Sequence, residues 1–187
     1  MKTAIICLQL GDSGKGRVSS YFCSKDYYHC SVKFNGGGNS GHVVYDADNK
    51  LHKFHHLSAA AAYGKKTFID TGAVINLKGL KKELVNFGRP VDLYISENVH
   101  LVTEEHLRKD ADGSGVIGTT KQGIGYAYSD RALRIGRRVT QKDIDEYNIK
   151  ATLYRGLPPF KKGESVIFEG GQGIMLDLDY GNYPFCT

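Results

Sequence analysis

Short apolar runs recur along the chain, separated by segments with helical periodicity. Near-continuous apolar runs predict strands buried on both faces of a parallel sheet. Leu77, Leu80, Leu84 and Phe87 recur at helical spacing and predict a helix over 77–87. The predicted strands span 4–10, 31–35, 67–70, 92–96 and 165–169, and further helices are expected over 15–25 and, with a more polar pattern, 142–154.

Strands that alternate with helices predict an α/β fold whose central sheet is mostly parallel and flanked by helices. The 187 residues suffice for a hydrophobic core, so we expect a single domain over 1–187. The first apolar run is too short for a signal peptide or a membrane span. Four cysteines without C-x-x-C spacing favour a reducing cytosol, so a cytoplasmic protein is expected.

Charge and glycine content indicate the kind of ligand that the protein binds. The net charge of +5 suits a protein that binds phosphates, but the sequence has no Lys/Arg block of the kind that binds nucleic acid. The 23 glycines cluster at a few places, which predicts binding loops built from backbone. One glycine-rich stretch, 112–125, is long for a loop without a function.

The first glycine cluster follows the apolar run 4–8 and reads Leu-Gly-Asp-Ser-Gly-Lys-Gly over residues 10–16, here called the phosphate turn. Its glycines let backbone N–H groups surround an anion, and Lys15 adds a positive charge. Gly16 stands where a Walker P-loop has its Mg²⁺-binding Ser/Thr, which argues against a small kinase. Asp12 would repel a phosphate unless it binds a metal or accepts a proton, so the turn predicts phosphoryl chemistry. The alternative is a structural strand-to-helix turn.

The second cluster, residues 34–42, reads Phe-Asn-Gly-Gly-Gly-Asn-Ser-Gly-His and is here called the glycine loop. It also follows a predicted strand. Asn39 and Ser40 offer hydrogen bonds to a ligand, and His42 could donate a proton. The alternative is a tight turn followed by a structural histidine.

Two other polar groups are interpreted as structural. His52, His55 and His56 lack a cysteine or carboxylate at the spacing of a zinc site, so we expect packing and local hydrogen bonds. The charges of 81–83 predict a solvated helix face.

Five segments in order resemble the adenylosuccinate synthetase family. They read Gly-Asp-x-Gly-Lys-Gly, Gly-x-Asn-x-Gly-His, a Thr-Thr-containing glycine segment, Glu-Gly-Gly-Gln-Gly and a closing Asp-x-Asp-x-Gly-Asn-Tyr-Pro segment. The segments span 11–16, 37–42, 117–131, 169–173 and 177–187. The resemblance implies a P-loop-NTPase-like fold. The chain closes on a loop-like segment, and the family's aspartate-binding and guanine-reading segments have no counterpart, so the C-terminal part of the family fold is expected to be missing.

The resemblance also implies an activity, the GTP-driven joining of L-aspartate to C6 of IMP through a 6-phosphoryl intermediate. Asp12 matches the base and a Mg²⁺ ligand, His42 the group that steadies the phosphoryl group, and Lys15 the phosphate-binding lysine. The carbonyl of Gly41 matches a second metal ligand. The residues implied to bind the nucleoside triphosphate are Ser13, Gly14, Lys15, Gly16, Gly41 and His42.

The monophosphate site carries over in the same way. The residues that the resemblance implies to bind the purine monophosphate are Asp12, Asn39, Thr120, Arg134, Gln172 and Thr187. Arg134 matches an arginine that reaches the neighbouring subunit's site, which implies a homodimer.

Some positions depart from the family pattern and leave the substrate open. Ser13 replaces a common glutamate, Gly38 a common histidine, residues 121–122 a Gly-Arg pair and Tyr126 a proline. The chain resembles compact archaeal and phage relatives. One phage branch acts on dGMP with ATP or dATP, but it often replaces the catalytic aspartate by serine, whereas this chain keeps Asp12. IMP is therefore favoured over dGMP, and an inactive nucleotide-binding fragment is the remaining alternative.

Overall fold

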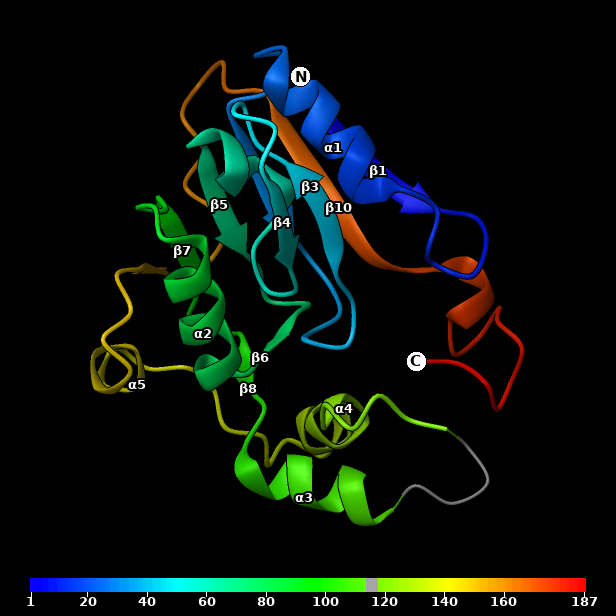
Figure 1. Ribbon diagram of the computed structural model, residues 1–187. Helices are drawn as coiled ribbons and strands as arrows, with labels where there is room; N and C mark the ends of the chain where they lie inside the picture. Colours follow the sequence, from blue (N-terminus) through cyan, green and yellow to red (C-terminus); the bar gives the residue numbers. More distant parts are fainter. Residues whose placement is uncertain (114–117) are drawn as a thin grey trace.

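Six strands form one parallel sheet at the centre of the computed structural model, which describes residues 1–113 and 118–187 (Figure 1). Across the sheet the order is β1, β10, β2, β5, β7 and β9, and every neighbouring pair is parallel. The predicted α/β class is confirmed. The strands are β1 (Lys2–Cys7), β2 (Cys30–Lys33), β5 (Lys66–Ile69), β7 (Leu93–Ser96), β9 (Thr152–Tyr154) and β10 (Val166–Gly173).

Helices and two small sheets surround this sheet. β3 (His42–Tyr45) and β4 (Leu51–Phe54) form an antiparallel hairpin, whereas β6 (Val74–Ile75) and β8 (His100–Leu101) are parallel. Below the sheet in Figure 1, α3 and α4 lie side by side. The helices are α1 (Lys15–Ser24), η1 (Ala59–Tyr63), α2 (Leu77–Phe87), α3 (Glu104–Asp112), α4 (Ile124–Leu133), α5 (Gln141–Glu146) and η2 (Ile174–Leu176).

The middle strands are buried on both faces, as their apolar runs predict. All four residues of β2 are buried. On one face, Ile69 of β5 and Ile95 of β7 pack in a cluster with Leu80 of α2. On the other face, Phe68 lies against Phe160, with ring centroids 5.2 Å apart. The core therefore lies on both sides of β2, β5 and β7.

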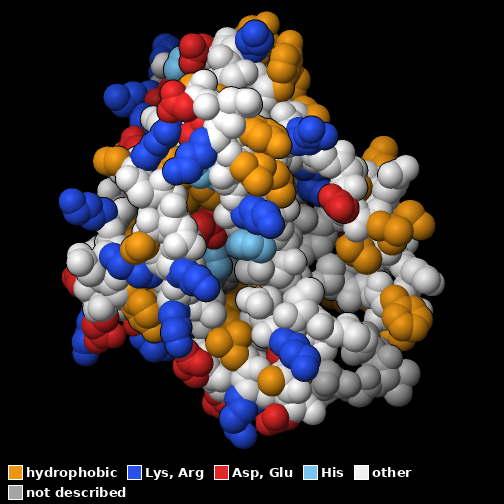
Figure 2. All heavy atoms as spheres, in the orientation of Figure 1, with side chains coloured by type: hydrophobic (Ala, Val, Ile, Leu, Met, Phe, Trp, Pro, Cys, Tyr) orange, Lys and Arg blue, Asp and Glu red, His pale blue; other side chains and the backbone are white. Residues whose placement is uncertain are grey.

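β1 differs because it forms one edge of the sheet. It ends at Cys7, three residues before the predicted end, and Ile6, Leu8 and Leu10 are 62%, 69% and 62% exposed. In Figure 2, hydrophobic side chains gather on the right, where Figure 1 places the C-terminal segment. Exposed apolar side chains of that segment include Leu178, Tyr180, Tyr183 and Phe185.

Helix α2 has the predicted bounds because both ends are capped. The side chain of Asn76 accepts a hydrogen bond from the Gly79 N–H at 3.0 Å, and Gly88, at φ 70°, ends the helix. The helix predicted over 142–154 is only half right. α5 stops at Glu146, and 152–154 form the edge strand β9, which pairs with β7. That pairing supplies backbone hydrogen bonds that a weak polar helix pattern cannot reveal.

Within 1–113 and 118–187, none of the helices combines the length and the apolar character needed to span a membrane.

Candidate active site

The candidate site lies at the edge where the parallel strands end. β1, β10 and β2 are neighbours, so the segments that follow them meet at the same edge of the sheet. These segments are the phosphate turn, the C-terminal segment from η2 onward and the glycine loop. A cavity of about 1730 Å³ lies between them and α4.

The phosphate turn folds around the side chain of Cys7 at the end of β1. The backbone N–H groups of Gln9 and Gly11 each lie 3.3 Å from the Cys7 Sγ atom. A hydrogen bond from Ser13, followed by these backbone contacts, lowers the pKa of the Cys7 thiol against the effect of burial. Lys15 is buried, and its Nζ donates to the Gly11 carbonyl at 2.6 Å. The lysine therefore holds the turn closed through its bond to the turn's own backbone.

Helix α1 begins directly after this turn. Gly14 is its N-cap, at φ 81°, and no side chain caps the helix. The first N–H groups of a helix have no partner within the helix and carry its positive dipole end. An anion is thus favoured at this end of α1.

The glycine loop is held by residues from distant parts of the chain. The Gly36 N–H donates to the Tyr128 hydroxyl at 3.0 Å, and the Gly36 carbonyl accepts from the Val74 N–H at 2.9 Å. The Asn35 side chain accepts from the Gly171 N–H at 2.7 Å. Contacts from α4, β6 and β10 therefore fix the loop.

The two glycine-rich segments meet at Gly16 and His42. A Cβ atom added at Gly16 would lie 2.5 Å from the His42 Cβ, closer than side chains approach one another. Only glycine lets α1 begin so close to the first residue of β3.

Glu169 of β10 orients His42. Its Oε2 lies 3.0 Å from the His42 Nδ1, and both carboxylate oxygens accept from the Ala59 N–H, at 3.1 and 3.2 Å. Glu169 is 1% exposed. A carboxylate can only accept, so Nδ1 carries the proton and Nε2 is left for a ligand. Nothing in the sequence around His42 indicates this partner, which is 127 residues away.

The structure brings together most of the predicted site residues, but not all. Two of them bond to each other directly, since the Asn39 Nδ2 donates to the Thr187 hydroxyl at 2.9 Å. The predicted residues that line the cavity are Asp12, Asn39, Gly41, His42, Thr120, Gln172 and Thr187. Those outside the described cavity wall are Ser13, Gly14, Lys15 and Gly16, at the start of α1, and Arg134, exposed at the end of α4.

One predicted binding stretch is described only in part. Residues 114–117 of the glycine-rich stretch 112–125 lie outside the described residues. On its described flanks, Asp110 accepts from the Thr119 hydroxyl and from the Gly123 N–H, each at 2.7 Å. These bonds fix the segment that carries Thr120 to the end of α3.

The donor set at the cavity suits Mg²⁺. Asp12 and Gly41 are exposed residues that both line the cavity, which offers a carboxylate and a backbone carbonyl as oxygen donors. Oxygen ligands of this kind, completed by substrate phosphates, are what Mg²⁺ prefers. Within 1–113 and 118–187, no group of three or more His, Cys, Asp or Glu side chains could hold a metal ion by itself.

Two of the three histidines, His52 and His56, have structural partners, as expected, whereas His55 is exposed and lines the cavity. His52 lies 2.8 Å from Asp46, and His56 lies 3.3 Å from Glu83. The prediction of a solvated face over 81–83 is wrong for Glu83. This side chain is buried because its carboxylate accepts from the backbone N–H groups of His55, His56 and Leu57.

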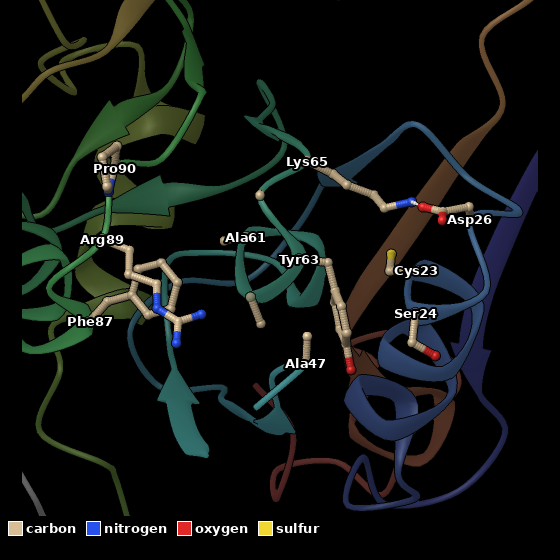
Figure 3. Close-up of a pocket in the computed structure, with 12 residues that line it drawn as sticks. Cys23, Ser24, Asp26, Ala47, Ala61, Tyr63, Lys65, Phe87, Arg89 and Pro90 are labelled. Atoms are coloured by element: carbon tan, nitrogen blue, oxygen red, sulfur yellow. Dashed lines mark hydrogen bonds and ion pairs between the residues drawn. The ribbon is translucent and has the colours of Figure 1, made fainter. Parts of the chain in front are cut away.

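A second hollow, of about 640 Å³, lies between α1, η1 and the end of α2 (Figure 3). Its cations are already paired. Lys65 donates to Asp26 at 2.7 Å, and Arg89 lies 3.0 Å from Asp46 and 2.8 Å from Asp48. We therefore place the candidate site at the larger cavity, where the carboxylate of Asp12 is exposed.

A family model and several known proteins match this chain. A family model described as adenylosuccinate synthetase matches residues 4–158, more than half of the chain. The adenylosuccinate synthetase of Thermosipho africanus is 36% identical over an alignment 232 positions long, which covers 100% of this chain and 57% of that protein. The adenylosuccinate synthetase of Picrophilus torridus is 31% identical, with coverage of 100% and 55%.

Two solved structures share the fold. The fully ligated adenylosuccinate synthetase from Plasmodium falciparum matches with a TM-score of 0.79 at 26% identity, over 99% of this chain and 55% of that one. The cyanophage S-2L succinoaminodeoxyadenylate synthetase bound to dGMP and dATP matches with a TM-score of 0.86, over 100% of this chain and 55% of that one; at 23% identity this likeness concerns the fold alone. The chain spans about half the length of the curated relatives it matches. By the family model, this chain belongs to the adenylosuccinate synthetase family.

Proposed function

We propose that this chain forms the phosphoryl-transfer half of an adenylosuccinate synthetase-type ligase, which joins L-aspartate to C6 of IMP with GTP and Mg²⁺. The observation that carries the proposal is that Asp12 and His42 line one cavity, with His42 held by the buried Glu169. A base and an oriented imidazole at one anion-binding edge are what such a phosphoryl transfer requires.

In the first step, the Asp12 carboxylate takes the N1 proton of the purine. The electron pair moves to the 6-oxygen, which attacks the γ-phosphorus of GTP while the bond to the β-phosphate oxygen breaks and GDP leaves. His42, whose Nδ1 donates to Glu169, stabilises the charge that develops on the transferred group through Nε2, which must also carry a proton to donate there.

In the second step, the amino group of aspartate attacks C6 and forms the new C–N bond. The bond between C6 and the phosphorylated oxygen breaks, and inorganic phosphate leaves with the proton that the amine gives up. The first step is needed because an oxo group is a poor leaving group whereas phosphate is a good one. The groups that bind aspartate are proposed to lie in the part of the family's length that this chain does not span.

The remaining contacts are assigned by position. The N-terminus of α1, with Ser13, Gly14, Lys15 and Gly16, binds the triphosphate. The Asp12 carboxylate and the Gly41 carbonyl would hold Mg²⁺, which would neutralise phosphate charge. Asn39, Thr120, Gln172 and Thr187 bind the monophosphate nucleotide from the cavity wall. Arg134, exposed beyond α4, reaches the partner's site in a homodimer. The reaction takes place in the cytoplasm, where the four cysteines, all free, stay reduced.

A second candidate is a synthetase that acts on dGMP with ATP or dATP. The specific support is that two departures from the family pattern lie together. A Cβ at Gly38 would be 3.3 Å from the Gln122 Oε1, so the missing side chain at Gly38 and the changed residue Gln122 lie next to each other in the structure. Two changed positions that lie next to each other alter the choice of purine more effectively than two separate changes do.

A turnover assay tests the proposal. The protein that carries this chain together with the rest of the family's length is given GTP or ATP, IMP or dGMP, aspartate and Mg²⁺, and the succinylated purine nucleotide is measured. We expect product from the unaltered protein and a loss on the order of 10²–10⁴-fold in Asp12→Asn. Product that survives this substitution would remove Asp12 as the base.

The matched control is Asp48→Asn, an exposed carboxylate on the β3–β4 hairpin. It should leave the rate within about twofold. Residues 1–187 alone should give no turnover, and a rate above background from them would contradict the need for the remaining part.

A further inference from the structure

A buried lysine in the middle of the sheet has no part in the function proposed above. Lys33, the last residue of β2, is 7% exposed. It lies directly opposite Glu169 in the parallel register of β2 and β10, so both side chains project from the same face of the sheet. Charged lysines are almost never buried without partners, so the contacts of this one need an explanation.

The ammonium group of Lys33 joins two segments of the cavity wall. Its Nζ donates to the carbonyl of His55, just after β4, in a short hydrogen bond. It also donates to the carbonyl of Gly37 in the glycine loop at 3.4 Å. His55 lines the cavity, and Gly37 lies between Gly36 and Asn39, which also line it. One buried cation thus ties the end of β4 to the glycine loop.

Charged and titratable groups face this cation from three elements. Glu83 from α2 and Glu169 from β10 favour the charged form of Lys33, whereas burial lowers the pKa of Lys33 to about 8. His56 lies nearby, and burial lowers its pKa, so it stays neutral at pH 7. Glu83 accepts from the N–H of His55, whose carbonyl accepts from Lys33. The Lys33 ammonium and the Glu83 carboxylate therefore bind the carbonyl and the N–H of the same residue, His55.

We propose that Lys33 is a positioning residue whose charged ammonium holds the glycine loop in its nucleotide-binding shape against the end of β4. The inference rests on the proposed function, because it takes the glycine loop as the purine-nucleotide site. The neutral amine has one N–H fewer, and it no longer balances Glu83 and Glu169. Loss of the charge therefore loosens the loop without removing any group that contacts the nucleotide.

Calorimetric titration with IMP and with dGMP compares three variants at pH 7. Lys33→Met should weaken binding at least tenfold, and Lys33→Arg should recover part of the loss because it keeps the charge. Lys66→Met is the matched control, since Lys66 begins the neighbouring strand β5 and its Nζ pairs with Glu164 at 2.5 Å, outside the cavity wall. It should bind within twofold of the unaltered protein, and circular dichroism checks that each variant is folded.

A pH series supplies a readout that a purely structural role would not move. Between pH 7 and 9 the unaltered protein should lose affinity as Lys33 gives up its proton, and Lys66→Met should follow the same curve. Lys33→Met and Lys33→Arg should lack this loss, because neither side chain titrates there. The ligand's own titration is common to all variants and cancels in the ratio of their affinities.

The outcomes separate this inference from the proposed function. Binding of neither nucleotide by the unaltered protein would contradict the proposed function. Binding by Lys33→Met within twofold of the unaltered protein, or the same pH dependence in both, would overturn the role of Lys33. Were Lys33→Met unfolded, the comparison of Lys33→Arg with the unaltered protein across the pH series would decide.

Discussion

The two glycine-rich segments of the site are held in different ways. The phosphate turn closes on itself, because the Cys7 sulfur and the Lys15 ammonium bond to backbone no more than four residues away. The glycine loop has long-range partners, since Gly36 and His42 bond to groups 92 and 127 residues away. The turn can therefore be recognised from a short motif, whereas the loop takes its shape from the whole fold. Substitutions far away in the sequence should then disturb the shape of the loop, whereas the turn should keep its shape when distant residues change.

The largest effect is expected from Glu169→Gln. The amide keeps the size of the side chain but puts a donor against the His42 Nδ1–H, so the ring turns or changes tautomer. We expect turnover of the assembled enzyme to fall on the order of 10²–10⁴-fold, as when an orienting carboxylate is lost from a histidine. Glu164→Gln, in the loop before β10, is the control and should stay within about twofold. Equal rates for both variants would show that His42 needs no orienting partner.

Gly16→Ala tests the contact between the two segments. The added methyl would overlap the His42 side chain, so α1 or β3 must shift. We expect a loss of stability of about 1–3 kcal/mol, measured by urea unfolding, together with weaker nucleotide binding. In Gly125→Ala the new Cβ would have no heavy atom of another described element within 4 Å, and the better helix former should stabilise α4 by up to about 1 kcal/mol. An unaltered midpoint for Gly16→Ala would contradict the close approach.

Tyr128→Phe removes one long-range support of the glycine loop. Its hydroxyl accepts from the Gly36 N–H and donates to the Gly72 carbonyl at 2.9 Å. Two backbone groups would lose their partner, so we expect a destabilisation of about 1–3 kcal/mol and faster amide exchange at Gly36. Tyr126→Phe, on the exposed side of the same helix, should change stability by less than about 0.5 kcal/mol. Similar losses in both would mean that the hydroxyl does not support the loop.

The smallest effect is expected within the phosphate turn, from Ser13→Ala. Ser13 is exposed, so stability should change by less than about 0.5 kcal/mol. The hydrogen bond from Ser13 is the largest influence that lowers the pKa of the Cys7 thiol, so its removal should raise that pKa. The pH dependence of Cys7 alkylation, followed by mass spectrometry, should then move to higher pH. A curve that stays in place would show that the turn's backbone alone sets the thiol's acidity.

The sequence predicts those parts of the fold that local chemistry decides. The apolar periodicity and caps of α2 fix its bounds, and β2, β5 and β7 are short buried runs. β9 was predicted as helix because only its pairing with β7 makes it a strand. The helices α3 and α4, which pack against each other, and the β3–β4 hairpin, whose strands pair with each other, were not predicted.

The site was predictable in its motifs but not in its connections. Asp12 and His42 stand in glycine-rich segments that the sequence displays. Nothing local indicates that β10 lies between β1 and β2, and this insertion is what brings Glu169 to His42 and beside Lys33. Glu83 was misjudged for the same reason, because its three backbone partners come from the segment after β4.

The most direct test of the central claim, that the phosphate turn and the glycine loop form one site, is to locate a bound metal. Mn²⁺ added in place of Mg²⁺ with a nucleoside triphosphate broadens the NMR signals of nearby amides. The account predicts broadening at Asp12 and Gly41 together, although 29 positions separate them in the chain. Broadening centred on Asp46 and Asp48 of the hairpin, or on only one of the two segments, would contradict it.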